Sequence, residues 1–236
     1  MKSVGIIGFG SFGAFLAEKL EPFVSVHISS RRPESVPERW RATLEVAAQC
    51  DYVIPSIPLD TYESVLTQIK PLLAPQSVIV DVCSVKVKPV EIIRHILPQT
   101  RLVATHPLFG PESAAHSLAN HTFVVCPDAS DPETMAEISL FAHSLGLHVV
   151  SMTTDDHDKE MALVHALTFF IAQGLLDMRL ADVTLQTPSF GRLLKLAELE
   201  QNHSPDLFRT IQSGNPYAAS VRRRFIDTLT QIDRSA

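Results

Sequence analysis

The chain has 236 residues, of which 45% are hydrophobic and 19% are charged. This composition supplies enough apolar side chains for a core and is not typical of a disordered protein. The net charge of −6 does not favour a nucleic acid or an acidic membrane as a partner. The three cysteines are dispersed without metal-ligand spacing, and we see no signal segment and no long apolar run. We therefore expect a cytoplasmic protein without a metal ion or a membrane span.

Strand-like and helix-like segments alternate through the first part of the chain. Short apolar runs predict strands at 4–7, 24–28, 52–57, 78–82, 102–105, 122–126 and 148–152. Apolar residues at helical spacing predict helices at 11–20, 42–50, 61–73, 89–97 and 132–145. Buried strands that alternate with helices predict an α/β fold of the Rossmann type. Its doubly wound, mainly parallel sheet would carry helices on both faces.

The strand signals stop near Met152, and the rest of the chain has only helical patterns. Helices are expected at 155–180, 190–199, 205–213 and 216–232. We predict two domains: a dinucleotide-binding domain over residues 1–152 and a smaller all-helical domain over residues 153–236. The long first helix has an apolar stripe that needs a partner surface, from the first domain or from a second copy of the chain.

A glycine-rich turn follows the first predicted strand and opens the first predicted helix. It reads Gly8-Phe9-Gly10-Ser11-Phe12-Gly13, the GxGxxG pattern of dinucleotide-binding folds. The glycines would permit a tight turn, a close approach to a pyrophosphate, and close packing of helix on strand. The alternative is a glycine-rich turn without a ligand. The predicted cofactor-binding residues at and beside this turn are Gly8, Gly10, Ser11, Phe12, Gly13 and Ser56.

The second predicted strand indicates which dinucleotide the turn would bind. An NAD site usually has an acidic residue about 20 positions after the glycine motif. Residues 27–32 instead read His-Ile-Ser-Ser-Arg-Arg, and arginine suits a 2′-phosphate because it binds phosphate bidentately. We predict NADP as the cofactor, with Ser30 and Arg31 as contacts. A solvated basic loop is the alternative.

Two polar segments follow other predicted strands, at the sheet edge where open α/β folds bind ligands. One reads DVCSVK over residues 81–86, and the other reads THPLFGPES over residues 105–113. His106 is the best candidate for proton transfer, since an imidazole with a pKa near ~6.5 accepts a proton at neutral pH. Ser84 would hold the imidazole or a substrate hydroxyl, and Lys86 would orient the loop or add positive potential. We predict these three residues as catalytic; a structural hydrogen bond is the alternative for a lone histidine.

The segments GFGSFG, DVCSVK and THPLFGPES, in this order and spacing, resemble the prephenate/arogenate dehydrogenase family, especially its plant-type members. The similarity continues at residues 156–158 and 193–216 and so covers nearly the whole chain. It implies a helical dimerisation domain, hence a homodimer, and NADP-dependent oxidative decarboxylation of prephenate or arogenate. His106 would deprotonate the ring hydroxyl as hydride leaves the same carbon. Loss of CO₂ would then restore aromaticity.

The resemblance also implies substrate-binding residues in the helical domain. Lys195 matches a position where a cation meets a substrate carboxylate. His165 shares a helix face with Phe169 and Gln173, and we expect this face at the substrate; core packing is the alternative. His203 stands where plant-type members usually have Asp or Asn. Since a neutral imidazole gives the ammonium of arogenate no fixed negative partner, His203 favours prephenate.

Two other functions fit the same features. Another NADP-dependent oxidoreductase of this two-domain plan would keep the glycine turn and Arg31, but would not need His106 beside Ser84 and Lys86. A non-catalytic NADP-sensing protein would bind the cofactor with His106 dispensable.

Overall fold

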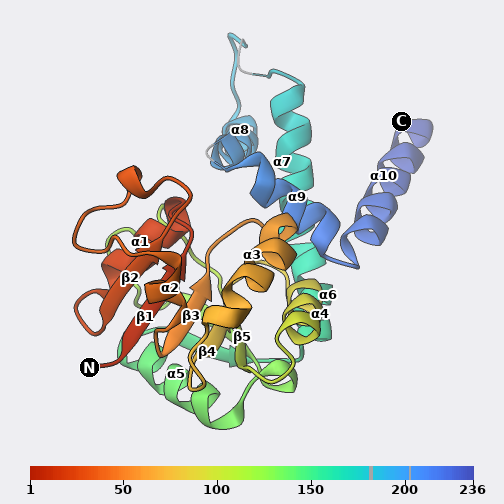
Figure 1. The fold of residues 1–236 in the computed structure, drawn as a ribbon. Helices are drawn as coiled ribbons and strands as arrows, with labels where there is room; N and C mark the ends of the chain where they lie inside the picture. Colours follow the sequence, from red (N-terminus) through yellow and green to blue (C-terminus); the bar gives the residue numbers. More distant parts are fainter. Residues whose placement is uncertain (181–182, 202) are drawn as a thin grey trace. The chain divides into compact units, whose positions relative to one another are not determined.

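The computed structural model describes residues 1–180, 183–201 and 203–236. It divides the chain into two compact units, Met1–Asp155 and Asp156–Ala236, which Figure 1 shows in red to green and in cyan to blue. The division falls three residues after the boundary that the loss of strand signals predicts, since helix α6 (Thr154–Met161) begins just before it.

The first unit is built on a seven-stranded sheet with the order β2-β1-β3-β4-β5-β6-β7. The strands are β1 (Ser3–Ile7), β2 (Ser25–Ser29), β3 (Tyr52–Pro55), β4 (Val78–Asp81), β5 (Arg101–Pro107), β6 (Thr122–Cys126) and β7 (His148–Ser151). All neighbours are parallel except β5 and β6. No helix crosses over between those two strands, so they pair antiparallel, whereas parallel strands need a crossover. The predicted Rossmann-type fold is confirmed.

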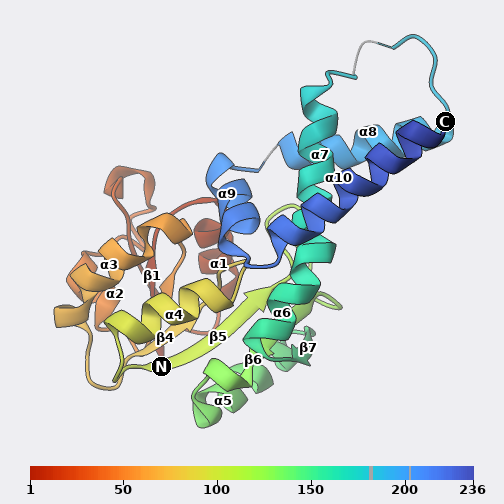
Figure 2. The same ribbon diagram turned by 90° about the vertical axis from the view of Figure 1, so that its right-hand side faces the viewer.

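Helices cover both faces of this sheet. They are α1 (Ser11–Leu20), α2 (Leu44–Ala48), α3 (Tyr62–Ile69), α4 (Val87–Ile96) and α5 (Pro132–Ser144). Strand side chains alternate between two cores: Ile6 and Val80 pack with α1 and α5, whereas Ile7 and Ile79 pack with α2, α3 and α4. Figure 2 shows α3 and α4 together on one side of the sheet. Short 3-10 turns lie at η1 (Pro33–Ser35), η2 (Leu59–Thr61), η3 (Lys70–Leu72) and η4 (Pro127–Ala129).

Helices are the only regular secondary structure among the described residues of the second unit. It contains most of α6, then η5 (Ala162–Ala166), α7 (Leu167–Asp177), α8 (Pro188–Gln201), α9 (Pro205–Gly214) and α10 (Ala218–Ser235). The turn η5 is a π-helix, so the single long helix predicted over 155–180 is interrupted by a wider turn. A small core joins η5, α7, α9 and α10 through Ala166, Phe169, Ile211 and Ala218.

The helical run Thr154–Asp177 is long and apolar enough to cross a membrane. The expectation that no segment of the chain meets this criterion is therefore wrong. Apolar residues dominate the run from Met161 onward, although isolated polar residues such as His165 and Gln173 interrupt them. A core helix of a globular domain has the same length and composition, so this feature alone does not indicate a membrane protein.

Candidate active site

The carboxyl ends of the parallel strands bring the predicted cofactor and catalytic segments to one edge of the sheet. Ile7, the last residue of β1, is in register with Ser29 of β2 and Pro55 of β3. Asp81, the last residue of β4, is in register with Ala104 of β5. The loops that follow these strands therefore begin at neighbouring points of this edge, which is the ligand-binding edge of open α/β sheets.

The glycine turn has the geometry that a dinucleotide requires. Gly8 has a φ of 108°, and a Cβ there would lie 2.2 Å from the Ser56 carbonyl oxygen, so only glycine fits. A Cβ at Gly13 would lie 2.6 Å from the Gly8 carbonyl oxygen, whereas a Cβ at Gly10 would meet nothing within 4 Å. Gly10 is the N-cap of α1. The open side of the turn thus fits a phosphate against the first N–H groups of the helix.

Three other predicted cofactor residues flank this turn. Ser11 is exposed at the first position of α1. Ser56 donates its backbone N–H to the Ile7 carbonyl oxygen (2.8 Å), which fixes the end of β3 beside the turn. The Phe12 side chain lines an apolar cavity between α1 and α5, so we assign any role of Phe12 at the turn to its backbone.

The basic segment after β2 is held next to the glycine turn. The backbone N–H of Gly8 donates to the Ser29 carbonyl oxygen (2.8 Å). Ser30 is half-buried, and its Oγ accepts a hydrogen bond from the backbone N–H of Arg32 (3.1 Å). Arg31 is exposed. A guanidinium group is therefore available where an NAD-binding fold usually places a carboxylate.

His106 is the last but one residue of β5 and is 4% exposed. Its backbone is in register with Val124 of β6, so this neighbouring strand holds it. By alternation along β5, His106 lies on the sheet face of Leu102, which packs in the core formed with α3 and α4. Thr105 and Pro107 lie on the opposite face, against the cavity between α1 and α5. The half-buried Ser84 follows β4 at the same edge.

Lys86 is fully buried in a polar network beneath this edge. Its ammonium group binds the Asp81 carboxylate and donates to the Thr105 carbonyl oxygen. The other Asp81 oxygen accepts from the hydroxyl of buried Tyr62 (2.9 Å) and the backbone N–H of Cys83 (3.1 Å). Burial and the neighbouring Asp81 hold the pKa of Tyr62 well above its usual value. Of the two roles considered for Lys86, this position favours orienting the loop over adding positive potential, because the Asp81 carboxylate already balances its charge.

Sequence reasoning did not single out Asp81 and Tyr62 as members of the site. A signal was present for Asp81, because an acid that ends a continuous apolar strand, with a lysine five positions later, needs a buried partner. No local pattern connects Tyr62 to it, since the two residues meet only when α3 packs on the sheet.

In the second unit, His165 and His203 flank the same phenylalanine. The ring centroids of His165 and Phe169 are 4.5 Å apart and nearly perpendicular, and those of Phe169 and His203 are 5.0 Å apart. Burial, together with the nearby His203 and His157, lowers the pKa of His165 to about 4. His165 is therefore a neutral hydrogen-bonding group at physiological pH.

The structure gives Phe169, Gln173 and Lys195 three different surroundings. Phe169 is 6% exposed and belongs to the core of the second unit, so core packing explains its place on the stripe. The Gln173 amide binds Asp177 (3.0 Å). Lys195 is exposed on α8. Among the described residues, no group of three His, Cys, Asp or Glu side chains could hold a metal ion.

Comparison with known proteins finds relatives that are similar to this chain. Residues 36–151 match the nucleotide-binding domain of prephenate dehydrogenase. The chain is 27% identical to arogenate dehydrogenase 1, chloroplastic, of Arabidopsis thaliana, over 94% of this chain but only 37% of that protein. It is also 27% identical to the cyclohexadienyl dehydrogenase of Zymomonas mobilis, over 75% of this chain and 67% of that protein.

The fold has a counterpart among solved structures. The prephenate dehydrogenase of A. aeolicus, in complex with hydroxyphenyl propionate and NAD+, superimposes with a TM-score of 0.80 at 21% identity, over 99% of this chain and 90% of that chain. At this identity the likeness concerns the fold alone.

Proposed function

We propose that the chain, whose residues 36–151 match the nucleotide-binding domain of prephenate dehydrogenase, is an NADP-dependent dehydrogenase that oxidatively decarboxylates prephenate, arogenate or both. The observation that carries this proposal is the place of His106. A histidine buried at the end of β5 shares one sheet edge with a glycine turn of dinucleotide-binding geometry. Such an edge can hold a hydride acceptor and a proton acceptor close together.

The residues at the glycine turn fit a dinucleotide. The turn and the N-terminus of α1 would bind the pyrophosphate, while Ser30 and Arg31 would bind the 2′-phosphate that distinguishes NADP. When bound, the nicotinamide ring supplies a hydride acceptor. A related structure contains NAD+, so the choice between the two dinucleotides rests on Arg31 and the absence of an acid at residues 27–32.

His106 would bind the ring hydroxyl of the substrate. It would accept the hydroxyl proton as the carbon that bears this hydroxyl gives up a hydride and becomes a carbonyl. The bond to the carboxylate then breaks, carbon dioxide leaves, and the electron pair makes the ring aromatic with a phenolate oxygen. The proton held by His106 would return to this oxygen, so no further acid or base is needed. Ser84 would hold the imidazole or the hydroxyl. Lys86, being buried, would act as a positioning residue that ties the end of β4 to the end of β5 through Asp81.

Three residues of the second unit are proposed substrate contacts. The exposed ammonium of Lys195 would meet a substrate carboxylate. His165 would contribute a neutral imidazole, in keeping with its lowered pKa. The exposed His203 offers no fixed negative charge to an ammonium group, which favours prephenate over arogenate.

The direct test follows the absorbance of reduced nicotinamide with NADP and either prephenate or arogenate. We expect turnover with at least one substrate. The His106→Asn variant should lose about 10²–10⁴-fold in kcat, the usual contribution of general acid–base catalysis, while NADP affinity stays within about twofold. Turnover by His106→Asn within a few-fold of the wild type would remove the catalytic assignment. NADP binding without turnover of either substrate would favour another small-molecule oxidoreductase or an NADP sensor.

A further inference from the structure

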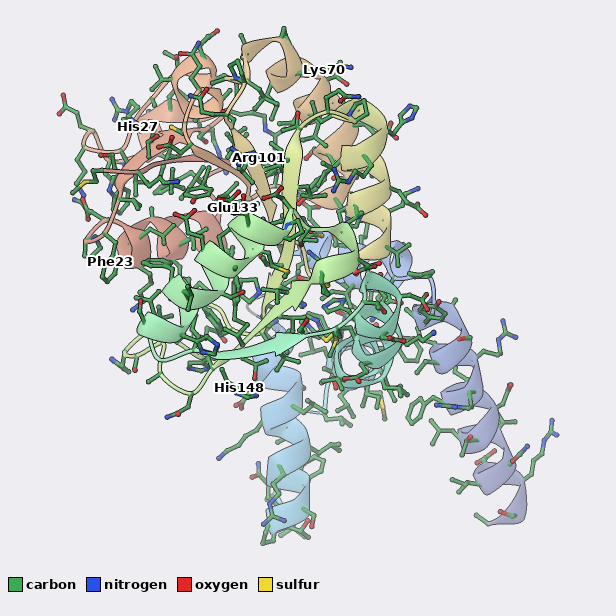
Figure 3. The ribbon with its side chains drawn as sticks, turned by 90° about the horizontal axis from the view of Figure 1, so that it is seen from below. Phe23, His27, Lys70, Arg101, Glu133 and His148 are labelled. Carbon is green, nitrogen blue, oxygen red and sulfur yellow. The ribbon has the colours of Figure 1, made fainter. Side chains whose placement is uncertain are left out.

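The cavity that Phe12 lines lies in the first unit, on the sheet face that carries α1 and α5. It has a volume of about 300 Å³, at the lower end of the range for small-molecule sites. It exists because three helices, α2 to α4, cover one face of the seven-stranded sheet, whereas only α1 and α5 cover the other. Figure 3 views the unit from this side, with α5 in green and Phe23 labelled just past the end of α1.

The wall of this cavity is almost entirely apolar and rich in aromatic rings. Six phenylalanines line it: Phe12, Phe15, Phe23, Phe109, Phe123 and Phe141. Two pairs of these rings meet edge to face, Phe15 with Phe109 and Phe23 with Phe141. Phe23 is 47% exposed, which leaves an aromatic surface in water at the cavity. Such a wall favours a flat aromatic ligand, since aromatic pairs add to the free energy of burial.

The charges beside the cavity favour an anionic group on that ligand. Lys2 lies at Glu137 (3.4 Å) and donates to the Tyr52 hydroxyl (3.3 Å), so its charge is already balanced. Lys19 donates to the Ala115 carbonyl oxygen (3.0 Å), and no carboxylate in the described part of the chain pairs with it. A ligand carboxylate would therefore find its cation in Lys19.

We propose that this cavity is a second small-molecule site, which binds a fused-ring aromatic carboxylate between α1 and α5. The site is separate from the one at the sheet edge. Thr105 and Pro107 line the cavity, whereas His106 between them lies on the opposite face of the sheet. Since the two faces share one strand, a ligand here would contact both neighbours of His106 without touching the proposed substrate.

The test uses 2-naphthoate as the ligand, titrated calorimetrically into the full chain in saturating NADP, which blocks the glycine turn. We expect saturable binding with one ligand per chain. Ala142 lines the cavity and is buried, so Ala142→Phe should fill it and weaken binding at least about tenfold. Leu140 lies on the same helix but is 71% exposed, so Leu140→Phe is the matched control and should bind like the wild type.

The role of the Lys19 charge is tested by comparing a charged ligand with a neutral one. Lys19→Met should weaken 2-naphthoate but leave the neutral analogue 2-naphthylmethanol unchanged, while Lys70→Met, which removes an exposed lysine of η3, should change neither. Equal weakening of both ligands by Lys19→Met would overturn the role of Lys19. Wild-type affinity in a folded Ala142→Phe variant would overturn the site itself.

A measurement on the wild type covers the case in which Ala142→Phe does not fold. Methyl NMR spectra with 2-naphthoate should show ring-current shifts at Leu16, Leu118 and Leu145, which line the cavity, but not at Leu140. Shifts confined to other methyl groups, or no saturable shift, would contradict the proposal whatever the variants do.

Discussion

Arg31 is the residue on which the choice of dinucleotide depends. Its guanidinium is exposed just after β2, beside the glycine turn. A charge-assisted contact to phosphate is worth about 1.5–3 kcal/mol, so Arg31→Ala should weaken NADP by about 10–100-fold. Binding of NAD, which has no 2′-phosphate, should change less than about twofold. Arg32→Ala, one position later and equally exposed, is the matched control. Titration of both dinucleotides measures the effect, and equal losses would remove the 2′-phosphate argument.

Lys86 is a buried residue that ties the end of β4 to the end of β5 below the candidate site. Lys86→Met would leave the fully buried Asp81 carboxylate without its cation, and breaking a buried pair in this way lowers the free energy of unfolding by about 3–5 kcal/mol. Urea unfolding of the variant should show this loss. The double variant Lys86→Met with Asp81→Asn should recover much of it, because no buried charge remains. A single variant as stable as the wild type would show that the pair does not hold the strand ends.

Residue roles were predictable from sequence where a backbone requirement fixes the residue type. The positive φ of Gly8 and the close packing of Gly13 follow from the motif alone. The burial of Lys86 and the meeting of His165 with His203 around Phe169 do not, because each depends on packing between segments distant in sequence.

At the scale of elements, the alternation of apolar patterns predicted every strand of the sheet to within a few residues. The apolar pattern could not predict that β6 runs antiparallel to β5, since antiparallel and parallel strands have the same local pattern. It also could not give the π turn η5, because the apolar spacing on either side continues as in a regular helix. Gln212 of α9 donates to the Ala166 carbonyl oxygen at the end of this turn (2.7 Å), which ties η5 to its neighbour.

The turn η5 predicts a pH dependence of stability. The pKa of His165 within it is about 4, below the ordinary 6.5, so the unfolded chain binds a proton more readily than the folded one. The stability is therefore complete above pH 6.5 and falls as the pH decreases from 6.5 towards 4, by up to about 3 kcal/mol. Urea unfolding at several pH values should show a flatter profile for His165→Gln. His148→Gln, at an exposed histidine, should keep the wild-type slope, and an unchanged slope in His165→Gln would contradict the assignment.

At the scale of the whole molecule, the two units differ in how completely they bury their apolar surface. The first unit has a large apolar core on each face of its sheet and a smaller apolar cluster at β5 and β6. The described residues of the second unit form one small core, and every residue of α10 from Ile226 onward is exposed. Figure 1 shows this end of α10 with no other helix of the second unit beside it. The apolar pattern of the sequence predicted that the helix over 155–180 needs a partner surface, but it did not single out α10.

We propose that a second copy of the chain covers α10. Ile226, Leu229 and Ile232 recur every third residue and are 45%, 48% and 57% exposed, so they form an apolar stripe of the kind that packs between helices. Light scattering should show a homodimer at micromolar concentration, and Leu229→Arg should shift it towards monomer, because a pair of arginines would face each other or remain buried unpaired. Leu140→Arg, at the more exposed apolar residue of α5, should leave the dimer intact. If the wild type is monomeric, or if both variants dissociate equally, α10 is not the interface.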